Sequence, residues 1–405
     1  MRILFLGAAI ASHPQPGLSA RQKFDYLGKN TGNLLIGQSI FEELVFTEHS
    51  YGKRLPPEEA NERFDMIVIA AANFIFKNFD FGDLADFIDQ TKLPIVIVGL
   101  GAQAPEQGHS IEDIPAGTRR LLSIVSDRSK VIGVRGYYTA DVMNKFGHKN
   151  VRAVGCPSLY RARRRNLKIE RPADYSRCRI SLNGSRNVFG HSYSPGNALR
   201  VESEIIKLSV RNGLCYVLQN EDPEFYFSAG GETSDENKRH LAAIVQQLGL
   251  PVSTGEYEEH VKKHFKIFFT LEEWDTYIRE FDASVGSRFH GNLIALTNEK
   301  PAIIIAHDSR TTEMAELMHI PHLRIDEIAS LELSRWFEAA DFDAFEKQYI
   351  KLYDHFAEFL NENGLEHRLG DALAPTQPGG HIALSRQPKE PLPAAKTAEY
   401  LQNTR

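Results

Sequence analysis

The feature that most constrains the fold of this chain is a repeated succession of a short apolar segment, a polar or glycine-containing loop, and an amphipathic segment. Residues 65–71 (DMIVIAA) and 94–101 (PIVIVGLG) are continuously apolar. Strands that are apolar on both faces and alternate with helices indicate a parallel sheet covered on both sides. In the first half we expect strands at 3–7, 65–71, 94–101, 131–134 and 151–154, and helices at 34–45, 84–90, 119–125 and 139–146.

The same alternation resumes after a basic segment, 161–177, which has few apolar residues and is typical of an interdomain linker. We therefore expect an α/β fold of two doubly wound, Rossmann-like domains facing a cleft, at 1–160 and 178–366, the second with closing C-terminal helices. The Pro- and Gly-containing tail, 367–405, is predicted to be disordered. The second half should hold strands at 179–182, 214–219, 266–270, 282–285 and 302–305, and helices at 198–210, 236–248, 272–281, 292–296, 312–318, 334–340 and 345–363.

Composition narrows the class of protein. The 405 residues include 3 Cys without a C-x-x-C pair, which argues against a disulfide framework or a thiolate zinc site and fits a reducing compartment. A net charge of -6 argues against a whole-protein electrostatic grip on nucleic acid. No apolar run reaches the ~20 residues that span a bilayer. The apolar start ends too early for a signal peptide, so we assign it to the first strand. These features predict a cytoplasmic protein, with peripheral attachment to the inner face of the membrane as a further option.

The most informative strand-to-helix junction is 284–292 (SVGSRFHGN), where an apolar strand ends at Gly286. The N-terminus of the following helix offers free N–H groups and a partial positive charge, which attract anions. Arg288 adds a bidentate donor suited to phosphate or carboxylate, and His290 adds a group that titrates near neutral pH. The alternative is a helix cap with an internally paired arginine and a satisfied histidine.

Other junctions carry further candidates, because parallel sheets bind ligands at the carboxyl ends of their strands. In each case a turn, a helix cap or a surface ion pair is the structural alternative. The candidates are Asn30, Gly32 and Asn33 before the first helix, Gly101 and Gln103 after 94–101, Arg135 after 131–134, Asn183 and Arg186 after 179–182, and His307, Asp308 and Arg310 after 302–305.

Several common site motifs are missing. The chain has no G-x-G-x-x-G fingerprint, no G-K-[ST] phosphate loop and no G-x-S-x-G nucleophile elbow. His260 and His264 have helical i, i+4 spacing, but the glutamate of a zincin motif is absent, so we expect surface histidines and no metal site. The arginine run at 161–165 is predicted to be solvated, or else to attract an anionic acceptor or a membrane surface.

Together the junction residues resemble the polysaccharide pyruvyl transferase family. The family often has Asp after its first motif glycine, where this chain has Asn33, which weakens a role for a carboxylate there. The resemblance excludes the tail and rests on Asn30, Gly32 and Ile40, on Gly99, Gly101 and Gln103, on Arg135, on Gly155, Pro157 and Ser158, and above all on the S-R-F-H-G-N-L-x-A-L block that contains Arg288 and His290.

This resemblance implies a fold similar to two-domain GT-B glycosyltransferases and transfer of pyruvate from phosphoenolpyruvate to two sugar hydroxyls, forming a cyclic ketal in glycan synthesis. It implies no cofactor, and as partners phosphoenolpyruvate and a sugar or glycan acceptor, free or lipid-linked. His290 would be the acid/base and Arg288 would clamp the donor, helped by Arg186 or Arg135. Asn30, Asn183, His307 and Asp308 would line the cleft.

Two other functions stay open at the level of sequence. A sugar-nucleotide glycosyltransferase would place a diphosphate at the same helix N-terminus, and would need Asp308 or Glu313 as a carboxylate for the donor ribose. A non-catalytic carbohydrate- or anion-binding protein could use the same scaffold, and Asn33 keeps that option open. Nothing in the sequence specifies the acceptor sugar or the oligomeric state.

Overall fold

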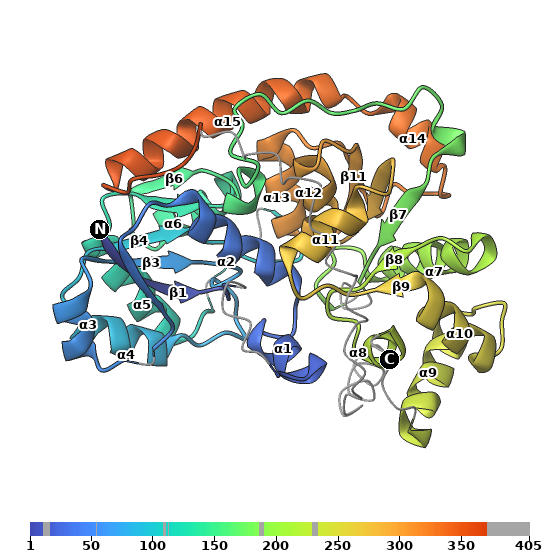
Figure 1. The fold of residues 1–405 in the computed structure, drawn as a ribbon, viewed down its shortest axis with the longest axis horizontal. Helices are drawn as coiled ribbons and strands as arrows, with labels where there is room; N and C mark the ends of the chain where they lie inside the picture. Colours follow the sequence, from blue (N-terminus) through green and yellow to red (C-terminus); the bar gives the residue numbers. More distant parts are fainter. Residues whose placement is uncertain are drawn as a thin grey trace.

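The computed structural model contains two large parallel sheets, each covered by helices on both faces, and a two-stranded parallel pair that continues the first (Figure 1). The structure describes residues 1–10, 17–53, 55–107, 111, 113–185, 190–228 and 234–370. Helix α15 lies across the top of both halves in Figure 1. The expected α/β architecture of two doubly wound domains is confirmed. Among the described residues, no helix is both long and apolar enough to cross a membrane.

The N-terminal sheet has the strand order β2-β1-β3-β4, and a bridge from Leu100 to Val134 extends it to the β5-β6 pair. Side chains of β1 alternate between its faces: Ile3 and Phe5 pack into one hydrophobic cluster, and Leu4 and Leu6 into the other. The sheet is therefore buried on both sides. Its elements are β1 (Arg2–Gly7), α1 (Ala20–Tyr26), α2 (Gly32–Glu43), β2 (Glu48–Tyr51), α3 (Pro57–Arg63), β3 (Met66–Ala70), α4 (Gly82–Gln90), β4 (Ile95–Val98), α5 (Ala116–Arg128), β5 (Ile132–Val134), α6 (Tyr137–Lys145) and β6 (Val151–Ala153).

The C-terminal sheet has the order β12-β11-β10-β7-β8-β9 with all pairs parallel. The order reverses between β7 and β10, where Asn183 is the register partner of Gly286. Such a reversal is where open α/β sheets bind ligands. Its elements are β7 (Ile180–Asn183), α7 (Pro195–Asn212), β8 (Tyr216–Val217), α8 (Asp222–Ser228), α9 (Asp235–Gln247), α10 (Thr254–His264), β9 (Phe265–Lys266), α11 (Leu271–Ile278), β10 (Ala283–Gly286), α12 (Phe289–Thr297), β11 (Ala302–Ala306), α13 (Ser309–Met318), β12 (His322–Arg324), α14 (Leu333–Ala339) and α15 (Phe342–Glu362).

Six elements were not predicted: α1, β2, α3, α8, α10 and β12. They are short or strongly polar, so they lack the apolar period that marks the others. The strand expected at 266–270 is shorter and starts earlier, at Phe265. Thr270 leaves the strand because its side chain accepts a hydrogen bond from the backbone of Glu273 and caps α11.

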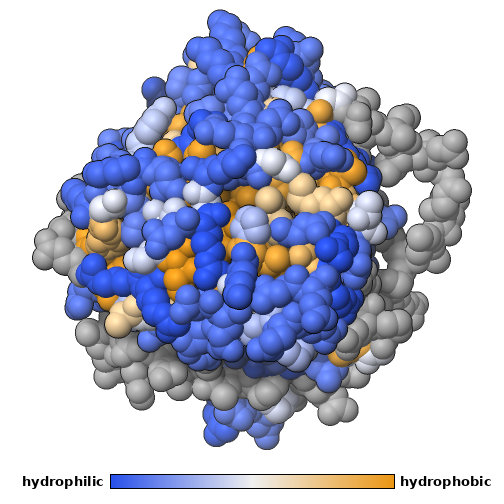
Figure 2. All heavy atoms as spheres, turned by 90° about the vertical axis from the view of Figure 1, so that its left-hand side faces the viewer, coloured by the Kyte–Doolittle hydropathy of each residue, from blue (hydrophilic) through white to orange (hydrophobic). Residues whose placement is uncertain are grey.

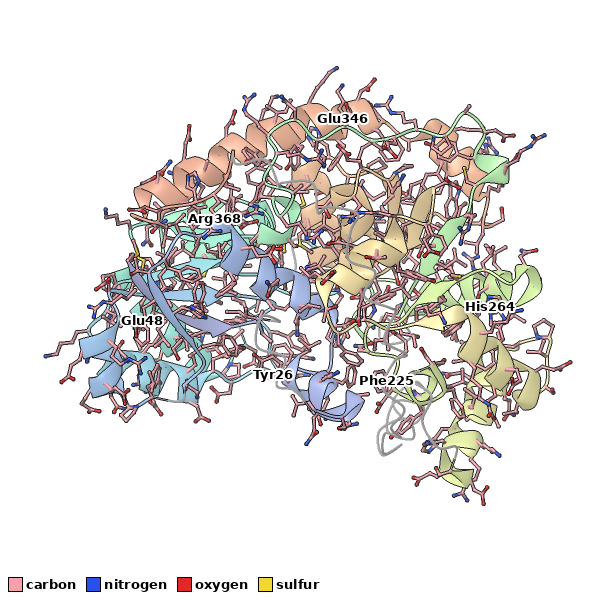
Figure 3. All side chains as sticks on the ribbon, in the orientation of Figure 1. Tyr26, Glu48, Phe225, His264, Glu346 and Arg368 are labelled. Atoms are coloured by element: carbon pink, nitrogen blue, oxygen red, sulfur yellow. The ribbon has the colours of Figure 1, made fainter. Side chains whose placement is uncertain are left out.

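The segment between the two sheets runs beside α15, and its cations are paired internally. The expectation of a solvated run therefore holds for Arg164 and Arg165, whose side chains are 40% and 51% exposed, and is wrong for Arg161, which is 11% exposed. A helix that returns along the segment supplies many of the carboxylates, and Glu346, labelled in Figure 3, is one of them. The pairs are Arg161–Asp275 at 2.5 Å, Arg164–Glu299 at 3.1 Å, Arg165–Asp354 at 2.6 Å and Arg171–Glu346 at 3.4 Å.

Beyond α15 the chain returns to the N-terminal half. The backbone N–H of Val131 donates to the Asn363 side chain at 3.2 Å, and that of Val45 donates to the carbonyl of Glu366 at 2.9 Å. The backbone N–H of Arg368 donates to the carbonyl of Glu43 at the end of α2 (Figure 3). Residues 371–405, most of the predicted tail, lie outside the described residues.

The face at the left of Figure 1 belongs to the N-terminal half. Figure 2 shows this face as hydrophilic over most of its area, with patches of hydrophobic residues near its centre.

Candidate active site

A network of amide side chains fixes the loop between β10 and α12. The Asn292 amide donates to the carbonyl of Gly286 at 2.8 Å, and the Asn183 amide donates to the Asn292 side chain at 3.0 Å. The Asn183 side-chain oxygen accepts from the backbone N–H of Arg288 at 3.0 Å. Asn183 is fully buried. Its part in the structure is to hold this loop in position, at the reversal of the strand order.

Arg288 is the N-cap residue of α12, and its guanidinium turns toward internal partners. Nη2 donates to the side chains of Asn220 and Glu221, and Nε donates to the carbonyl of Gly184 at 3.3 Å. Glu221 is almost fully buried and also accepts from the backbone N–H of Gln219 at 2.7 Å. The positive charge of Arg288 is therefore paired with a buried carboxylate, as in the structural alternative for this junction.

His290 lies in the first turn of α12, between a thiol and the first turn of α2. Its Nε2 is 3.5 Å from Sγ of Cys156, which is 2.8 Å from the hydroxyl oxygen of Ser158. On the other side of the ring, a Cβ added to Gly32 would lie 3.2 Å from Nδ1. The two ring nitrogens thus face different environments, with Nδ1 toward α2.

Burial lowers the pKa of His290 well below 6.5, and the positive charges of Arg135, Arg310 and Arg288 lower it further. The imidazole is therefore neutral in the free molecule at neutral pH, and the expectation that it titrates near neutrality was wrong. Sequence reasoning could not supply this, because Arg135 and Arg310 come from other strand-to-helix loops, which only the fold brings close to His290.

Arg135 lies almost fully buried at the end of β5. Its guanidinium donates to the carbonyl of Gly99 at 2.9 Å, to the side-chain oxygen of Asn73 at 2.7 Å and to the carbonyl of Ala71 at 3.4 Å. Within the described chain, none of these hydrogen bonds goes to a carboxylate. A Cβ at Gly101 would come 2.9 Å from the Arg135 side chain, so glycine gives this arginine its room.

The loop after β11 completes the cluster from the C-terminal half. Asp308, fully buried, accepts from the Gln103 amide at 3.0 Å and from the backbone N–H of Thr311 at 2.8 Å. Burial raises the pKa of Asp308, but the positive charge of Arg310 and the hydrogen bonds from Thr311 outweigh it, so the pKa is lowered and the carboxylate is charged. Burial lowers the pKa of His307 to about 4, so it is neutral.

Arg310 is held less firmly than the other two arginines. Its Nη2 lies 3.6 Å from the Asp308 carboxylate, and its Nε is buried without a hydrogen-bond partner among the described residues. The side chain keeps 23% of its surface exposed. Arg310 and Arg135 repel each other electrostatically. A pair of like charges, one of them held only by neutral groups, is an arrangement that a bound anion would stabilise.

The N-terminus of α2 meets this cluster through Gln219. The backbone N–H of Thr31 donates to the carbonyl of Gln219 at 3.1 Å, and a Cβ on Gly32 would lie 2.6 Å from the Gln219 side-chain oxygen. Asn30 is half-buried and accepts from the N–H of Gly32 at 2.9 Å. Asn33 turns away and donates to the carbonyl of Leu27 at 3.0 Å, where it supports the turn before the helix.

The structure thus brings together most of the predicted residues: Asn30, Gly32, Gly101, Gln103, Arg135, Asn183, Arg288, His290, His307, Asp308 and Arg310. Arg186 lies outside the described residues. Sequence reasoning missed Gln219, whose almost fully buried amide nitrogen has no partner in the described part of the chain. It also missed Cys156, Glu221 and Asn73. The only available signal was that Gln219 closes a predicted strand.

His260 and His264 stand apart from this cluster. Both are half-buried, their rings stack at 4.6 Å, and His260 is 2.8 Å from the Ser209 hydroxyl. The prediction of surface histidines was wrong because Ser209, on α7, packs against this face of α10. In the described ranges, no three His, Cys, Asp or Glu side chains gather in a way that would hold a metal ion.

The fold and the site define a two-domain α/β protein with a cationic cluster where the two parallel sheets meet. A family model, polysaccharide pyruvyl transferase, matches residues 25–309. The chain belongs to this family and is a transferase, and the family membership expected from the sequence is confirmed. The matched range contains Asn30, Arg135, Arg288 and His290. No curated protein matches the chain.

Several solved structures resemble the chain over most of its length. Anabaena Alr3699/HepE in complex with UDP and glucose shares 11% identity at a TM-score of 0.42, covering 89% of this chain and 99% of that one. The S. aureus MnaA–UDP structure shares 10% identity at a TM-score of 0.37, with 100% and 97% coverage. The glycosyltransferase SnogD from Streptomyces nogalater shares 10% identity at a TM-score of 0.31, with 89% and 96% coverage.

Proposed function

We propose that this transferase moves pyruvate from phosphoenolpyruvate to two hydroxyls of a sugar or glycan and forms a cyclic ketal. The observation that carries the proposal is the pair of arginines, buried Arg135 and partly exposed Arg310, beside a neutral His290. Phosphoenolpyruvate carries a phosphate and a carboxylate next to the reacting carbons. An anion of this kind would relieve the repulsion between the two guanidinium groups.

The donor would lie between the N-termini of α2 and α12. The first turn of α12 offers N–H groups that an α-helix leaves without an intrahelical partner, whereas at the start of α2 the N–H groups of Thr31 and Gly32 already donate to Gln219 and Asn30. The glycines in these turns, Gly32 and Gly291, leave room for the side chain of Gln219. Gln219 stands between these two glycines, with one atom of its amide within about 3 Å of where each Cβ would be. Its amide nitrogen, which has no partner in the described part of the chain, would donate a hydrogen bond to an oxygen of phosphoenolpyruvate.

The proton steps would depend on the bound anion. In the free molecule His290 is neutral, and the negative charge of the donor would raise its pKa so that it carries a proton. That proton goes to the methylene carbon, and the first sugar hydroxyl bonds to the adjacent carbon. The bond from that carbon to phosphate oxygen breaks, and the second hydroxyl closes the ring. Of the two hydroxyl protons, one returns to the imidazole and one leaves with phosphate.

Cys156 would position the imidazole for this role. Its contact with Nε2 leaves Nδ1 toward α2 and the donor. The thiol is fully buried and lies between the ring and Ser158. It is therefore a positioning residue, which holds one nitrogen so that the other can exchange the proton.

The reaction would run in the cytoplasm on a free or lipid-linked acceptor, without a cofactor. The test is phosphate release from phosphoenolpyruvate with a panel of sugar acceptors, followed by mass spectrometry of the product. We expect His290→Ala to abolish release while retaining the wild-type melting temperature. His148→Ala, in the loop before β6, is the matched control and should stay active. Turnover of a nucleotide sugar instead, or binding without release across the panel, would refute the proposal.

A further inference from the structure

The loop between β3 and α4 carries four phenylalanines in nine residues, in the segment NFIFKNFDF at 73–81. The rings of Phe74 and Phe81 stack at 4.1 Å, and Phe76 meets Phe79 edge-on at 5.2 Å. Phe79 keeps 45% of its surface exposed. In the described part of the chain, only Tyr137 is another exposed large hydrophobic side chain. The loop therefore presents the ring of Phe79 to solvent, on a base of buried or partly buried rings that includes Phe76. We call Phe79 and the rings beneath it the aromatic surface.

The exposure of Phe79 is built into a fixed backbone. Its carbonyl accepts from the hydroxyl of Thr118 at 2.6 Å, and its N–H donates to the carbonyl of Phe76 at 3.1 Å. Two residues on, the N–H of Phe81 donates to the same Thr118 hydroxyl at 3.2 Å. Thr118 is fully buried in α5. Holding an apolar ring in water on a rigid loop is unfavourable by itself, and preorganises it for a ligand.

The loop begins at the candidate active site. Asn73, its first residue, accepts from Arg135 at 2.7 Å and donates to the Gln103 side chain at 2.9 Å. Farther along, the ring of Phe76 contacts the ring of His191 edge-on at 5.4 Å. His191 is half-buried and comes from the C-terminal half, so the aromatic surface reaches across the junction between the halves.

His191 also connects this surface to the cationic cluster. It lies within electrostatic range of Asp308 and Arg310, and of the exposed Lys77 on the phenylalanine loop itself. Arg310 thus acts electrostatically on both His290 and His191, and the ring of His191 contacts that of Phe76. Polar donors beside an apolar ring match the two faces of a pyranose, which has C–H groups on one side and hydroxyls at its rim.

We infer that Phe76, Phe79 and His191 form the acceptor subsite, in which a pyranose packs its C–H face on Phe79 and directs its hydroxyls toward Arg310. The inference rests on the proposed function, because the acceptor must place two hydroxyls beside the donor carbon. It names the chemical class that this surface takes, a hexopyranose, free or at the end of a glycan. Exposed Lys77 would reach the hydroxyls at the outer edge.

The experiment compares Phe79→Ala with Tyr137→Ala, the matched exposed aromatic, in phosphate-release assays. For Phe79→Ala we expect the KM for the acceptor to rise about tenfold, while the KM for phosphoenolpyruvate and the melting temperature stay at the wild-type values. Tyr137→Ala should leave all three unchanged. An unchanged acceptor KM in Phe79→Ala, with transfer intact, would overturn the inference.

A binding measurement separates this inference from the proposed reaction. Phe79→Trp places a fluorophore on the surface, and methyl glycosides of glucose, galactose and mannose serve as probes. Wild-type protein gives the background of Trp274 and Trp336. We expect saturable quenching by a glycoside in the variant alone. Quenching without pyruvate transfer would keep the sugar subsite and reject the reaction, and transfer without quenching would reject the subsite.

Discussion

Gly32→Ala should separate activity from stability. Gly32 is the first residue of α2 and is not among the glycines with positive φ, so alanine fits its backbone. The added Cβ would lie 2.6 Å from the side-chain oxygen of Gln219, 3.0 Å from that of Asn30 and 3.2 Å from Nδ1 of His290. The Gln219 and Asn30 atoms are ends of side chains, which can shift without moving the backbone, and the His290 atom belongs to a ring that can tilt.

The two effects have opposite signs. Alanine gains up to ~1 kcal/mol over glycine in a helix, and moving Gln219 offsets part of that gain. The free energy of unfolding should therefore stay within about 1 kcal/mol of wild type. The new methyl group, however, fills the space in front of the reacting nitrogen. A displacement of about 1 Å in a catalytic group costs about 100-fold, or ~2.7 kcal/mol in the transition state.

The assay is kcat/KM for phosphate release, measured beside thermal denaturation. Gly255→Ala is the matched control, because Gly255 also lies in the first turn of a helix, α10, and a Cβ there would meet nothing within 4 Å. It should change stability in the same direction and leave activity intact. If Gly32→Ala keeps wild-type kcat/KM, Nδ1 of His290 does not face the substrate and the geometry of the proposed reaction is wrong.

Three further measurements test other parts of the structure. Cys156→Ala should shift the pH profile of kcat and Cys156→Ser should restore it, whereas a purely packing role would leave the profile in place. Burial raises the pKa of Glu202 from 4.5 to about 8, so folding favours its protonated form and the stability should fall as the pH rises from 4.5 to 8. Glu202→Gln should flatten this fall in melting temperature, and an unchanged slope would contradict the reasoning. Asp275→Asn breaks the ion pair with buried Arg161 and should lower the free energy of unfolding, measured with denaturant, by about 3–5 kcal/mol. Asp354→Asn breaks an exposed pair and should lower it by less than ~1 kcal/mol, and equal losses would refute the argument from burial.

Most of the sheet and helix order could be predicted from the sequence because each buried strand is marked by a local apolar run. The segments at β3 and β4 need nothing beyond their own residues to be recognised. The short polar helix α3 has no apolar run in its sequence. A helix this short is stabilised by its contacts in the fold, which a local pattern does not show. Local pattern therefore predicts the scaffold well and its short surface elements poorly.

The candidate site divides in the same way. Arg288 and His290 stand in one junction and could be selected from their neighbours in sequence. The carboxylate that pairs with Arg288 is Glu221, 67 residues away, and the groups that lower the pKa of His290 include Arg135 from the other half. No local sequence pattern shows that residues so far apart in the chain come into contact. Residue identity could therefore be predicted, and the charge state and partners of the residues could not.

The path of α15 has a consequence for synthesis on the ribosome. The ring of Phe359, on this helix, lies against Gly133, and the ring of Phe356 stacks on that of Tyr160 at 4.3 Å. The last part of the described chain therefore covers residues of the N-terminal half. At about 5–20 residues per second, roughly 10–40 s pass between synthesis of β6 and of the end of this helix. During that interval an apolar edge of the nascent N-terminal half stays uncovered, and a chaperone that binds apolar segments has its target there.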